Sequence, residues 1–526
     1  MGALALAAGC ATGWDQYAPA TSETSPTASA TPTETATPTE TAEAPPAADG
    51  WIAPTGEAPT TIDGFYSQEL TWGTCINTPY ECAAIWVPIN WDDPGMGAAT
   101  VAMARIKDET PGDHLGSILT NPGGPGSSGI DFLGYATSSI SQSVMDVYDI
   151  VAFDPRGVNF STPINCGTDA ELDAYFLSDL TIESQEDLDA AIEMNRQFGQ
   201  RCLEETGPLL GYVDTVSAAR DMDLMRALLG DEQLNYLGYS YGTQLGATYA
   251  GLFPENVGRL VLDGAVDLSL DADGQSKQQA AGFEQAFRAY VADCLTTPRR
   301  CPLTGTVDDG IQQIQDLIER AKTNPLPTDN DEPLNGALAY YGVIVAMYDD
   351  SSWSILSDAL KDAIENNDGS YLQYLANFYL DRDEQGHYTT NSMEAFVSIN
   401  CLDTPTIPRT YEELVAWRDE VAAVAPTVAE DFTMGPGCEG WPFPATGEIG
   451  AITADGAAPI VVIGTTGDPA TPYEWAVAMA SQLSSGVLVT YEGEGHTAYG
   501  RSNTCISDAV DQFFINGIVP ADGTNC

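Results

Sequence analysis

The arrangement of the apolar segments constrains the fold of this chain more than any other feature. Short, β-branched runs alternate with stretches of helical periodicity, such as Glu186–Glu205 and Thr215–Leu229. The later runs that predict strands are Tyr148–Phe153, Leu234–Gly238, Gly258–Leu262, Pro459–Gly464 and Val487–Tyr491. Such alternation is typical of βαβ units, whose strands pair in a parallel sheet. The earlier runs are Cys82–Trp91, Thr100–Lys107 and Gly116–Thr120, and the spacing of the first two favours an antiparallel hairpin.

The strand pattern stops between Leu270 and Trp441 and then resumes. The helical stretches in this region are Phe283–Cys294, Gly310–Lys322, Trp353–Asn366 and Tyr411–Val424. A helical insertion that splits an α/β sheet is the simplest architecture, and such an insertion commonly covers the site as a cap. We therefore expect an α/β core at residues 65–269 and 442–526, with a mostly parallel central sheet and an inserted helical cap at 270–441.

The first 64 residues lie outside this predicted core. Met1–Gly9 is small and apolar and leads into Cys10, in a pattern that resembles the lipobox of bacterial lipoproteins. The run lacks a basic start and is short for a signal peptide, so we expect residues 1–10 to be a signal remnant whose true start lies upstream. The alternative is an accidental Ala-rich start with an unpaired Cys10. Residues 11–64 are rich in Thr, Pro and Ala, which predicts a flexible tether.

Composition narrows the classes of function. The 526 residues carry a formal net charge of -57, so no basic surface is available for nucleic acid or for electrostatic docking on anionic membranes. The acidity is explained most simply by a solvated surface, although an acidic pocket for a peptide N-terminus is an alternative. No stretch of the sequence reaches the roughly 18 apolar residues of a membrane helix. A membrane contact is therefore expected only through a lipid at Cys10, on the outer face of the cell.

Cysteine spacing points to an oxidising compartment. Apart from Cys10, ten cysteines remain and no CxxC pair occurs, which disfavours a structural metal site and suits five disulfides. Sequence neighbours suggest Cys75–Cys82, Cys294–Cys301 and Cys505–Cys526. Cys166–Cys202 and Cys401–Cys438 follow by elimination, as a hypothesis.

The sharpest motif is Gly238-Tyr-Ser240-Tyr-Gly242, between a predicted strand and a helical stretch. A serine on such a turn exposes its Oγ at the sheet edge, with the helix N-terminus facing the developing negative charge. The serine needs a base, and only His114, His387 and His496 are available. His496 is favoured because it follows the last predicted strand, whereas the other two lie in polar loops.

Asp468 follows the strand Pro459–Gly464 and is the predicted partner of His496. Glu492 and Glu494 share the loop of His496, so neither is expected to reach its far nitrogen. The loop from Asn121 to Gly129, Asn-Pro-Gly-Gly-Pro-Gly-Ser-Ser-Gly, follows another strand and predicts an oxyanion hole, with the N–H groups of Gly124 and Tyr241 as donors. A phosphate-binding loop is the rival interpretation, but the P-loop lysine is missing.

These motifs, together with Asp154-Pro-Arg-Gly157, Thr466-Gly-Asp-Pro-Ala-Thr-Pro472 and Gly495-His-Thr497, resemble the secreted tripeptidyl aminopeptidases of high-GC Gram-positive bacteria. That family is related to the proline iminopeptidases and has a characteristic C-terminal segment. The resemblance spans Phe65 to Cys526. It implies an α/β-hydrolase fold, a cofactor-free serine mechanism, and peptide substrates with a free N-terminus. One departure is Asn159, where the family more often has glycine.

Other residues have weaker assignments. Tyr239, Glu494 and Thr471 are candidates for substrate binding, although Tyr239 and Tyr241 suit packing beside the elbow equally well. Asp154 and Arg156 suit a salt-bridged turn better than a substrate contact. An esterase or lipase on the same fold is the main alternative function, because ester and amide acyl transfer use the same groups. A non-catalytic surface-binding lipoprotein is the third. The oligomeric state and the carboxylates that bind the substrate amine are left open.

Overall fold

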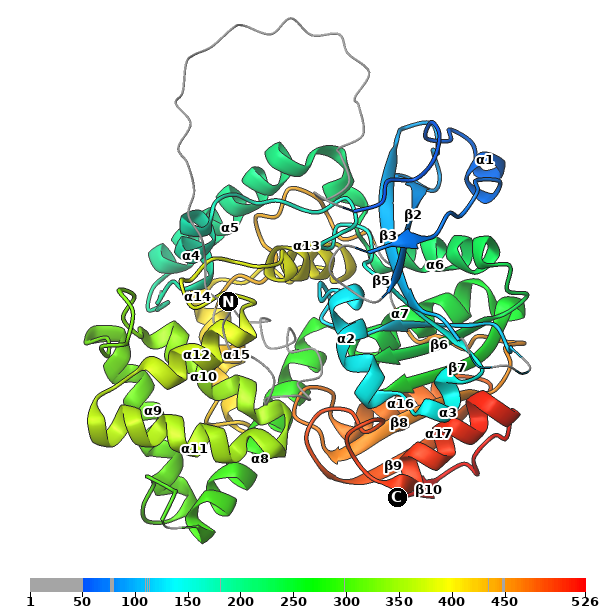
Figure 1. The fold of residues 1–526 in the computed structure, drawn as a ribbon. Helices are drawn as coiled ribbons and strands as arrows, with labels where there is room; N and C mark the ends of the chain where they lie inside the picture. Colours follow the sequence, from blue (N-terminus) through cyan, green and yellow to red (C-terminus); the bar gives the residue numbers. More distant parts are fainter. Residues whose placement is uncertain are drawn as a thin grey trace, which may run out of the picture.

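The computed structural model describes residues 51–75, 80–108, 110, 112, 114–179, 181–297, 299–433, 435–446 and 450–526. The predicted signal remnant, its Cys10 and most of the predicted tether lie outside the described residues. Figure 1 shows two parts side by side, one built on a β-sheet and the other on helices.

The sheet has ten strands in the order β1-β2-β3-β5-β4-β6-β7-β8-β9-β10. Their bounds are β1 Gly73–Thr74, β2 Glu81–Pro88, β3 Ala98–Ile106, β4 Ser117–Asn121, β5 Asp149–Phe153, β6 Leu234–Tyr239, β7 Val257–Asp263, β8 Ile460–Gly467, β9 Gly486–Glu494 and β10 Thr524–Asn525. Every predicted strand forms close to its expected bounds. The β2–β3 hairpin is antiparallel, β3 pairs antiparallel with β5, and all pairs from β5 to β10 are parallel. The predicted fold class is confirmed.

Helices cover both faces of the sheet, so its central strands are apolar on both sides. One face packs against α6 (Thr215–Leu229), α7 (Tyr241–Leu252) and α16 (Tyr473–Gln482). The other packs against α2 (Gly129–Ser139), α3 (Gln142–Met145) and α17 (Thr504–Asn516). Along β5, Val151 and Phe153 join the first core while Ile150 and Ala152 join the second. This two-sided burial explains why the strands read as continuous apolar runs.

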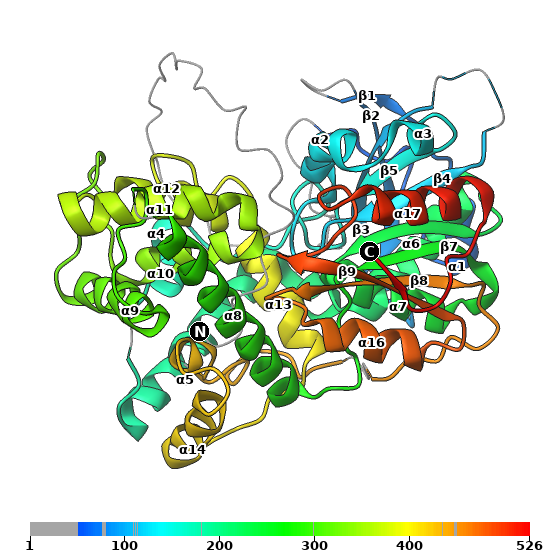
Figure 2. The same cartoon turned by 90° about the horizontal axis from the view of Figure 1, so that it is seen from below.

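The helical part contains the predicted insertion and one further segment. The insertion forms α8 (Ala272–Thr296), α9 (Val307–Thr323), α10 (Gly336–Ile344), α11 (Trp353–Lys361), α12 (Ser370–Tyr379), α13 (Ser392–Asp403), α14 (Tyr411–Ala422) and α15 (Ala429–Thr433). These helices lie beside the sheet, with α13 next to the ends of the central strands (Figure 2).

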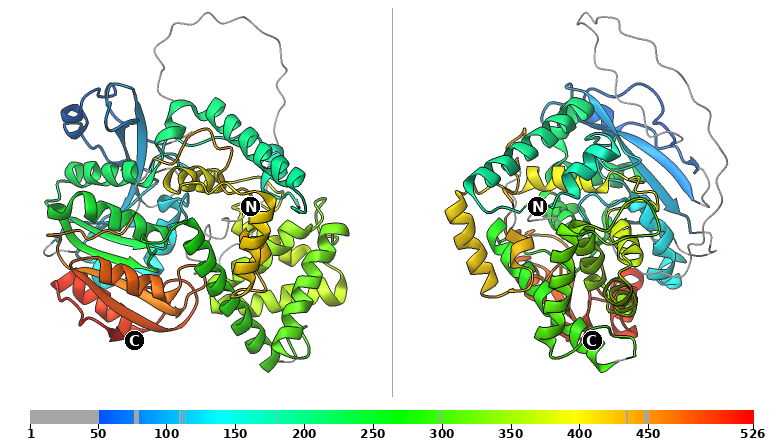
Figure 3. Two further views of the ribbon diagram at one scale, coloured as in Figure 1. Left: turned by 180° about the vertical axis from the view of Figure 1, so that it is seen from behind. Right: turned by 90° about the vertical axis from the view of Figure 1, so that its left-hand side faces the viewer.

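The further segment is α4 (Asp169–Phe176) and α5 (Gln185–Thr206), which precede β6 in the chain. Leu188 and Ala191 of α5 cluster with Leu414 of α14, and the Asn195 Nδ2 donates to the Gly437 carbonyl oxygen at 2.6 Å. Figure 3 shows both helices against the insertion. The prediction that residues 65–269 belong wholly to the core is therefore wrong for this segment, because its apolar faces are buried by the cap.

The packed chain also begins before residue 65, where the predicted tether ends. Trp51 stacks on Phe160 with ring centroids 4.7 Å apart, and its Nε1 donates to the Ala83 carbonyl oxygen at 3.1 Å. Helix α1 (Ile62–Tyr66) then buries Phe65 completely. The tether prediction is thus wrong for residues 51–64, because Trp51 packs against the core and the segment leads into α1, which is held by the buried Phe65.

The five predicted disulfides all form. The sulfurs of Cys75–Cys82, Cys166–Cys202, Cys294–Cys301, Cys401–Cys438 and Cys505–Cys526 are bonded. Cys401–Cys438 lies within the cap, and Cys505–Cys526 ties the chain end to α17.

A buried ion pair lies beneath the end of β5. The Arg156 guanidinium donates to both carboxylate oxygens of Asp221 at 2.6 Å, and both side chains are almost completely buried. Its remaining donors reach the carbonyl oxygens of Ile89, Tyr212 and Pro88. Asp154 is not part of this ion pair. Its carboxylate accepts from the Ser128 hydroxyl and from two backbone N–H groups, and burial raises its pKa to about 7. The structural interpretation of Arg156 is correct, although its partner is Asp221 of α6.

We expect Arg156→Met to lower the free energy of unfolding by about 3–5 kcal/mol, because it leaves the Asp221 carboxylate buried and unpaired. Urea denaturation measures this loss. The double variant Arg156→Met/Asp221→Leu should recover most of it, since no buried charge then remains. Arg196→Met, at an exposed ion pair with Glu193, is the control and should change stability by less than about 1 kcal/mol. A loss no larger than that of the control would contradict the prediction.

Candidate active site

Ser240 occupies a sharp turn between β6 and α7. Its φ is +56°, which is rare for a non-glycine residue, and its side chain is almost completely buried. Glycine is needed on both sides of it. A Cβ on Gly238 would lie 2.4 Å from the Gly242 carbonyl oxygen, and one on Gly242 would lie 2.8 Å from the Asn121 carbonyl oxygen. The chain thus has the strand–turn–helix geometry of a nucleophile elbow at Ser240, where the motif predicts one.

Hydrogen bonds with β7 and with the first turn of α7 hold the turn at Ser240 in place. The Ser240 N–H donates to the Asp263 carbonyl oxygen of β7 at 2.9 Å. The Thr243 hydroxyl donates to the Ser240 carbonyl oxygen at 2.6 Å and accepts from the Val266 N–H at 3.0 Å. These contacts over-determine the strained backbone, which is the condition under which such strain persists.

His496 and Asp468 form a buried pair. The His496 Nδ1 lies 2.9 Å from both carboxylate oxygens of Asp468, which follows β8. The same carboxylate accepts from the backbone N–H groups of Ala470, Thr471 and Thr497. These donors hold the carboxylate in place, and it in turn fixes the ring of His496 with Nδ1 as the proton-bearing nitrogen.

The other nitrogen of the ring, Nε2, is buried and has no hydrogen-bond partner among the described residues. Hydrogen bonds to a catalytic base are often long in substrate-free enzymes and shorten only when substrate binds. Gly264 lies directly beside the ring, since a Cβ there would be 3.2 Å from the His496 Cε1. Because Asp263, its neighbour, also anchors Ser240, the end of β7 joins the elbow to the histidine loop.

The other two histidines lie away from this site. His387 is exposed and its Nδ1 lies 2.7 Å from the Asp169 carboxylate, while His114 is half exposed beside Asp108. Glu492 accepts from Asn525 at the surface. Of the carboxylates weighed for His496, only Asp468 contacts its ring among the described residues.

The predicted oxyanion loop packs against the elbow. A Cβ on Gly123 would lie 2.6 Å from the Tyr239 carbonyl oxygen and 2.9 Å from the Ser240 Cβ, so only glycine allows this approach. Gly126 makes an equally close approach to α13, where a Cβ would be 2.4 Å from the Ser392 carbonyl oxygen. Gly124 lies between these two contacts. The loop is thus held between the nucleophile turn and the cap.

The candidates for substrate binding take different places. Tyr239 is buried edge-on against Phe132, with ring centroids 5.6 Å apart, which fits packing rather than substrate contact. Thr471 is buried and its hydroxyl lies 3.0 Å from an Asp468 oxygen and 3.2 Å from the His496 Nδ1, so it supports the pair. Glu494 is half buried, and burial raises the pKa of its carboxyl. The Tyr241 hydroxyl contacts Thr215 at 2.5 Å.

A cavity of about 590 Å³ lies between core and cap, beside the elbow. Tyr241, Pro125 and Val266 line it from the core, and Trp417 and Phe432 line it from the cap. The buried Asp403, whose pKa burial raises to about 7, also faces it. Its volume lies in the range of small-ligand sites, and its walls are mostly apolar with a few polar groups.

Asn159 stands at the position where the family that the motifs resemble more often has glycine. Its φ is +37°, in the left-handed region that glycine adopts freely and that asparagine tolerates better than most residues. Its N–H donates to Asn391 Oδ1 at 2.8 Å, and its side-chain amide donates to Asp131 at 3.0 Å. The loop therefore keeps a glycine-like backbone, and the asparagine side chain adds a contact with Asp131 of α2.

Sequence reasoning did not single out Asp263. Its carboxylate accepts from the N–H groups of Ala498 and Tyr499, just after His496, and burial raises its pKa to about 6. The available signal was its place directly after the predicted strand Gly258–Leu262, at the edge where the other site residues lie.

No cluster of three or more potential metal ligands occurs within the described part of the chain. The described helices include none with the length and apolar character that a membrane crossing requires.

Comparisons with known proteins agree with this geometry. Residues 116–306 match a family model described as the alpha/beta hydrolase fold, and residues 425–526 match one described as TAP-like protein. Serine protease Hip1 of Mycobacterium tuberculosis is 37% identical over 460 residues, which cover 85% of this chain and 87% of that protein. Carboxylesterase B of the same species is 36% identical over 499 residues, covering 92% and 94%. Tripeptidyl aminopeptidase of Streptomyces lividans is 29% identical over 475 residues, covering 87% and 86%.

The motifs, the strand order and these relatives all indicate the same family, along most of the chain. The resemblance that the motifs carry is thereby confirmed, and the protein is a serine hydrolase. The chain belongs to the α/β-hydrolase family, in the branch whose C-terminal segment is TAP-like.

Proposed function

We propose that this serine peptidase releases short peptides, above all tripeptides, from free N-termini through an acyl-enzyme on Ser240. The observation that carries the proposal is the joint arrangement of the elbow and the buried His496–Asp468 pair, both anchored by the end of β7. Relatives named serine protease and tripeptidyl aminopeptidase support the peptidase assignment.

In this mechanism the Ser240 Oγ attacks the carbonyl carbon of the scissile peptide bond while the His496 Nε2 takes its proton. The N–H groups of Gly124 and Tyr241 stabilise the oxyanion. When the C–N bond breaks, His496 returns the proton to the leaving amine. A water molecule, deprotonated by His496, then hydrolyses the ester on Ser240, and the peptide acid leaves. Asp468 keeps the ring in the required tautomer throughout.

The cavity beside Tyr241 supports a peptide-sized substrate. It is large enough for several residues of a peptide and mostly apolar, which suits small or proline-containing sequences. The many carboxylates of the cap suit a substrate ammonium.

We further propose that the enzyme works outside the cell, held at the membrane by a lipid on Cys10. The five disulfides support an oxidising compartment. Metabolic labelling with a fatty-acid probe tests the anchor, because a Cys10→Ala variant should lose the label and leave the cell surface.

The activity is tested by comparing a small tripeptide anilide, with a free and with an acetylated N-terminus, against a short-chain nitrophenyl ester. We expect kcat/KM for the free peptide to exceed that for the acetylated peptide by at least about 100-fold, because a desolvated charge contact is worth several kcal/mol. Equal cleavage of the two peptides would contradict the exopeptidase proposal. Turnover of the ester alone would favour an esterase, as the relative named carboxylesterase B suggests.

A further inference from the structure

The loop that carries His496 is enclosed by a segment of the cap. The backbone N–H of His496 donates to the carbonyl oxygen of Tyr348 at 2.7 Å. Tyr348 is the last residue of the short 3₁₀ helix Val345–Tyr348. The Tyr348 ring also meets the imidazole edge-on, with centroids 5.7 Å apart and an interplanar angle of 80°. A backbone contact from the cap thus reaches the predicted catalytic base itself.

Arg501 joins the same two parts. Its Nη1 donates to the Thr497 carbonyl oxygen and its Nη2 to the Glu494 carbonyl oxygen, both at 2.9 Å, so the guanidinium holds the loop on each side of His496. The Nη2 also lies 2.9 Å from the Asp350 carboxylate and 3.5 Å from that of Asp349, both in the cap. The Arg501 side chain is only 10% exposed.

Gly495 shows how closely the loop fits against this guanidinium. Its φ is +94°, and a Cβ there would lie 2.5 Å from the Arg501 Nη2 and 3.1 Å from the Tyr348 carbonyl oxygen. The Gly495 N–H donates to the Gly467 carbonyl oxygen at 3.2 Å, just before Asp468. A shift of the guanidinium would therefore move a loop that touches both members of the histidine–aspartate pair.

We propose that Arg501 is a positioning residue that couples the seating of the cap segment Tyr348–Asp350 to the placement of His496. The inference rests on the proposed function, in which His496 is the base. Arginine suits this role because its planar fork donates in several fixed directions at once, which a lysine ammonium does not. In this proposal the cap segment Tyr348–Asp350 holds the loop of His496 in place, in addition to covering the site.

The role predicts a change in turnover rather than in substrate affinity. Arg501 contacts two carbonyl oxygens and two carboxylates within the protein and does not line the cavity. Arg501→Met keeps most of the side-chain volume but none of the donors. We expect kcat to fall about 10- to 100-fold, since a displacement of about 1 Å at a catalytic group has effects of this size, while KM changes less than about threefold.

The test uses the full enzyme with the free tripeptide anilide. Reaction with a fluorophosphonate counts the sites that are folded and competent, so kcat is expressed per labelled site. Arg501→Lys should recover part of the lost kcat, because one contact with Asp350 or a carbonyl oxygen can form. Asp350→Asn should also lower kcat. In the double variant with Arg501→Met it should cause little further loss of kcat, since both changes break the same contact between Arg501 and Asp350.

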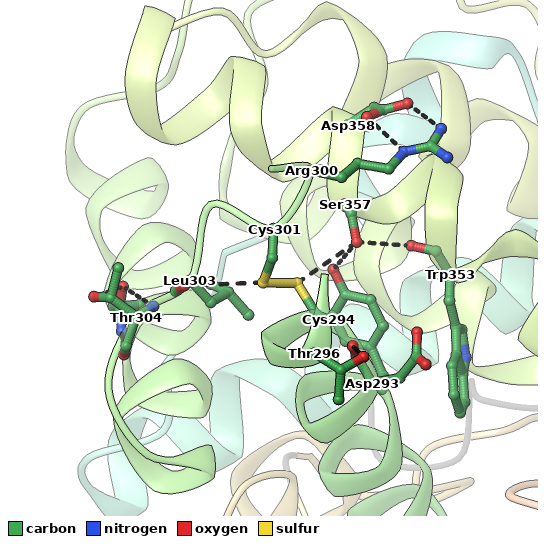
Figure 4. Close-up of a disulfide and its surroundings, with 12 residues drawn as sticks. Asp293, Cys294, Thr296, Arg300, Cys301, Leu303, Thr304, Trp353, Ser357 and Asp358 are labelled. Carbon is green, nitrogen blue, oxygen red and sulfur yellow. Dashed lines mark hydrogen bonds and ion pairs between the residues drawn. A yellow bond between two sulfur atoms is a disulfide. The ribbon is translucent and has the colours of Figure 1, made fainter. Parts of the chain in front are cut away.

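Arg300→Met is the matched control. Arg300 also donates to an aspartate of the cap, Asp358, and lies beside the Cys294–Cys301 disulfide (Figure 4), and its side-chain hydrogen bonds go to Asp358 rather than to the histidine loop. Its loss should leave kcat and KM unchanged. Wild-type kcat per labelled site in Arg501→Met would overturn the proposal, and so would equal loss in the control.

If Arg501→Met fails to fold, Arg501→Lys and Asp350→Asn still decide, because unchanged kcat in both would overturn the coupling. Failure of the proposed function looks different. In that case the wild-type enzyme would not cleave the peptide, or His496→Ala would leave turnover intact, whatever the Arg501 variants do.

Discussion

Ser240→Ala should lower kcat for the tripeptide anilide by about 10⁴- to 10⁶-fold while the protein stays folded. Removal of the nucleophile of a serine enzyme has effects of this size, and what remains comes from the oxyanion hole and binding alone. Folding should be unaffected because alanine meets the same strain as serine at φ +56°, and the Ser240 backbone contacts with Asp263 and Thr243 persist. Steady-state kinetics and circular dichroism measure the two effects.

Ser127→Ala is the control for this experiment. Ser127 lies in the oxyanion loop, near Gly124, but not on the elbow. We expect its kcat to stay within about tenfold of wild type, and its fluorophosphonate labelling to persist, whereas Ser240→Ala should lose the label. Residual activity of Ser240→Ala above about one thousandth would point to a different nucleophile.

Much of the core follows from the sequence because its signals are local. The apolar runs of β4 and β5 are buried along their whole length, and that of β8 along nearly all of it, so these strands are easily recognised. The glycines of the elbow and of the oxyanion loop are dictated by close backbone approaches, such as Gly123 against Ser240. Motifs of this kind show where chemistry-bearing residues leave the strands. They therefore predict Ser240, Asp468 and His496 at one edge of the sheet.

Features that depend on distant contacts did not follow. The periodicity of α5 predicts a helix, but nothing in its own sequence shows that Leu188 packs on Leu414 of the cap. Asp263 and Arg501 are single charged residues in an acidic chain, and their roles come from the backbone groups that surround them in the fold. The cavity is likewise assembled from segments spread over core and cap.

Asp468→Asn should lower kcat by about 10⁴-fold with little change in fold. An asparagine amide can donate to the His496 Nδ1, which would place the ring proton on Nε2, and that nitrogen could then no longer accept the Ser240 proton. The amide also lacks the charge that stabilises the imidazolium formed during attack. The Ala470 and Thr471 N–H groups both donate to Oδ1 and can still meet the asparagine oxygen, so the loop should keep most of its shape, whereas the Thr497 N–H, which donates to Oδ2, loses its acceptor to the amide nitrogen.

Asp263→Asn separates this role from the general effect of a buried carboxylate near the ring. Asp263 accepts only from the Ala498 and Tyr499 N–H groups in the described structure, and an amide oxygen can replace one of these contacts. We expect its kcat to fall less than about 100-fold, from a loosened histidine loop. The opposite ranking, with Asp263→Asn inactive and Asp468→Asn active, would show that a different carboxylate orients His496. We predict this ranking because of one geometric difference. Asp468 contacts the ring nitrogen of His496 itself, whereas Asp263 contacts only backbone N–H groups that follow His496 in the chain.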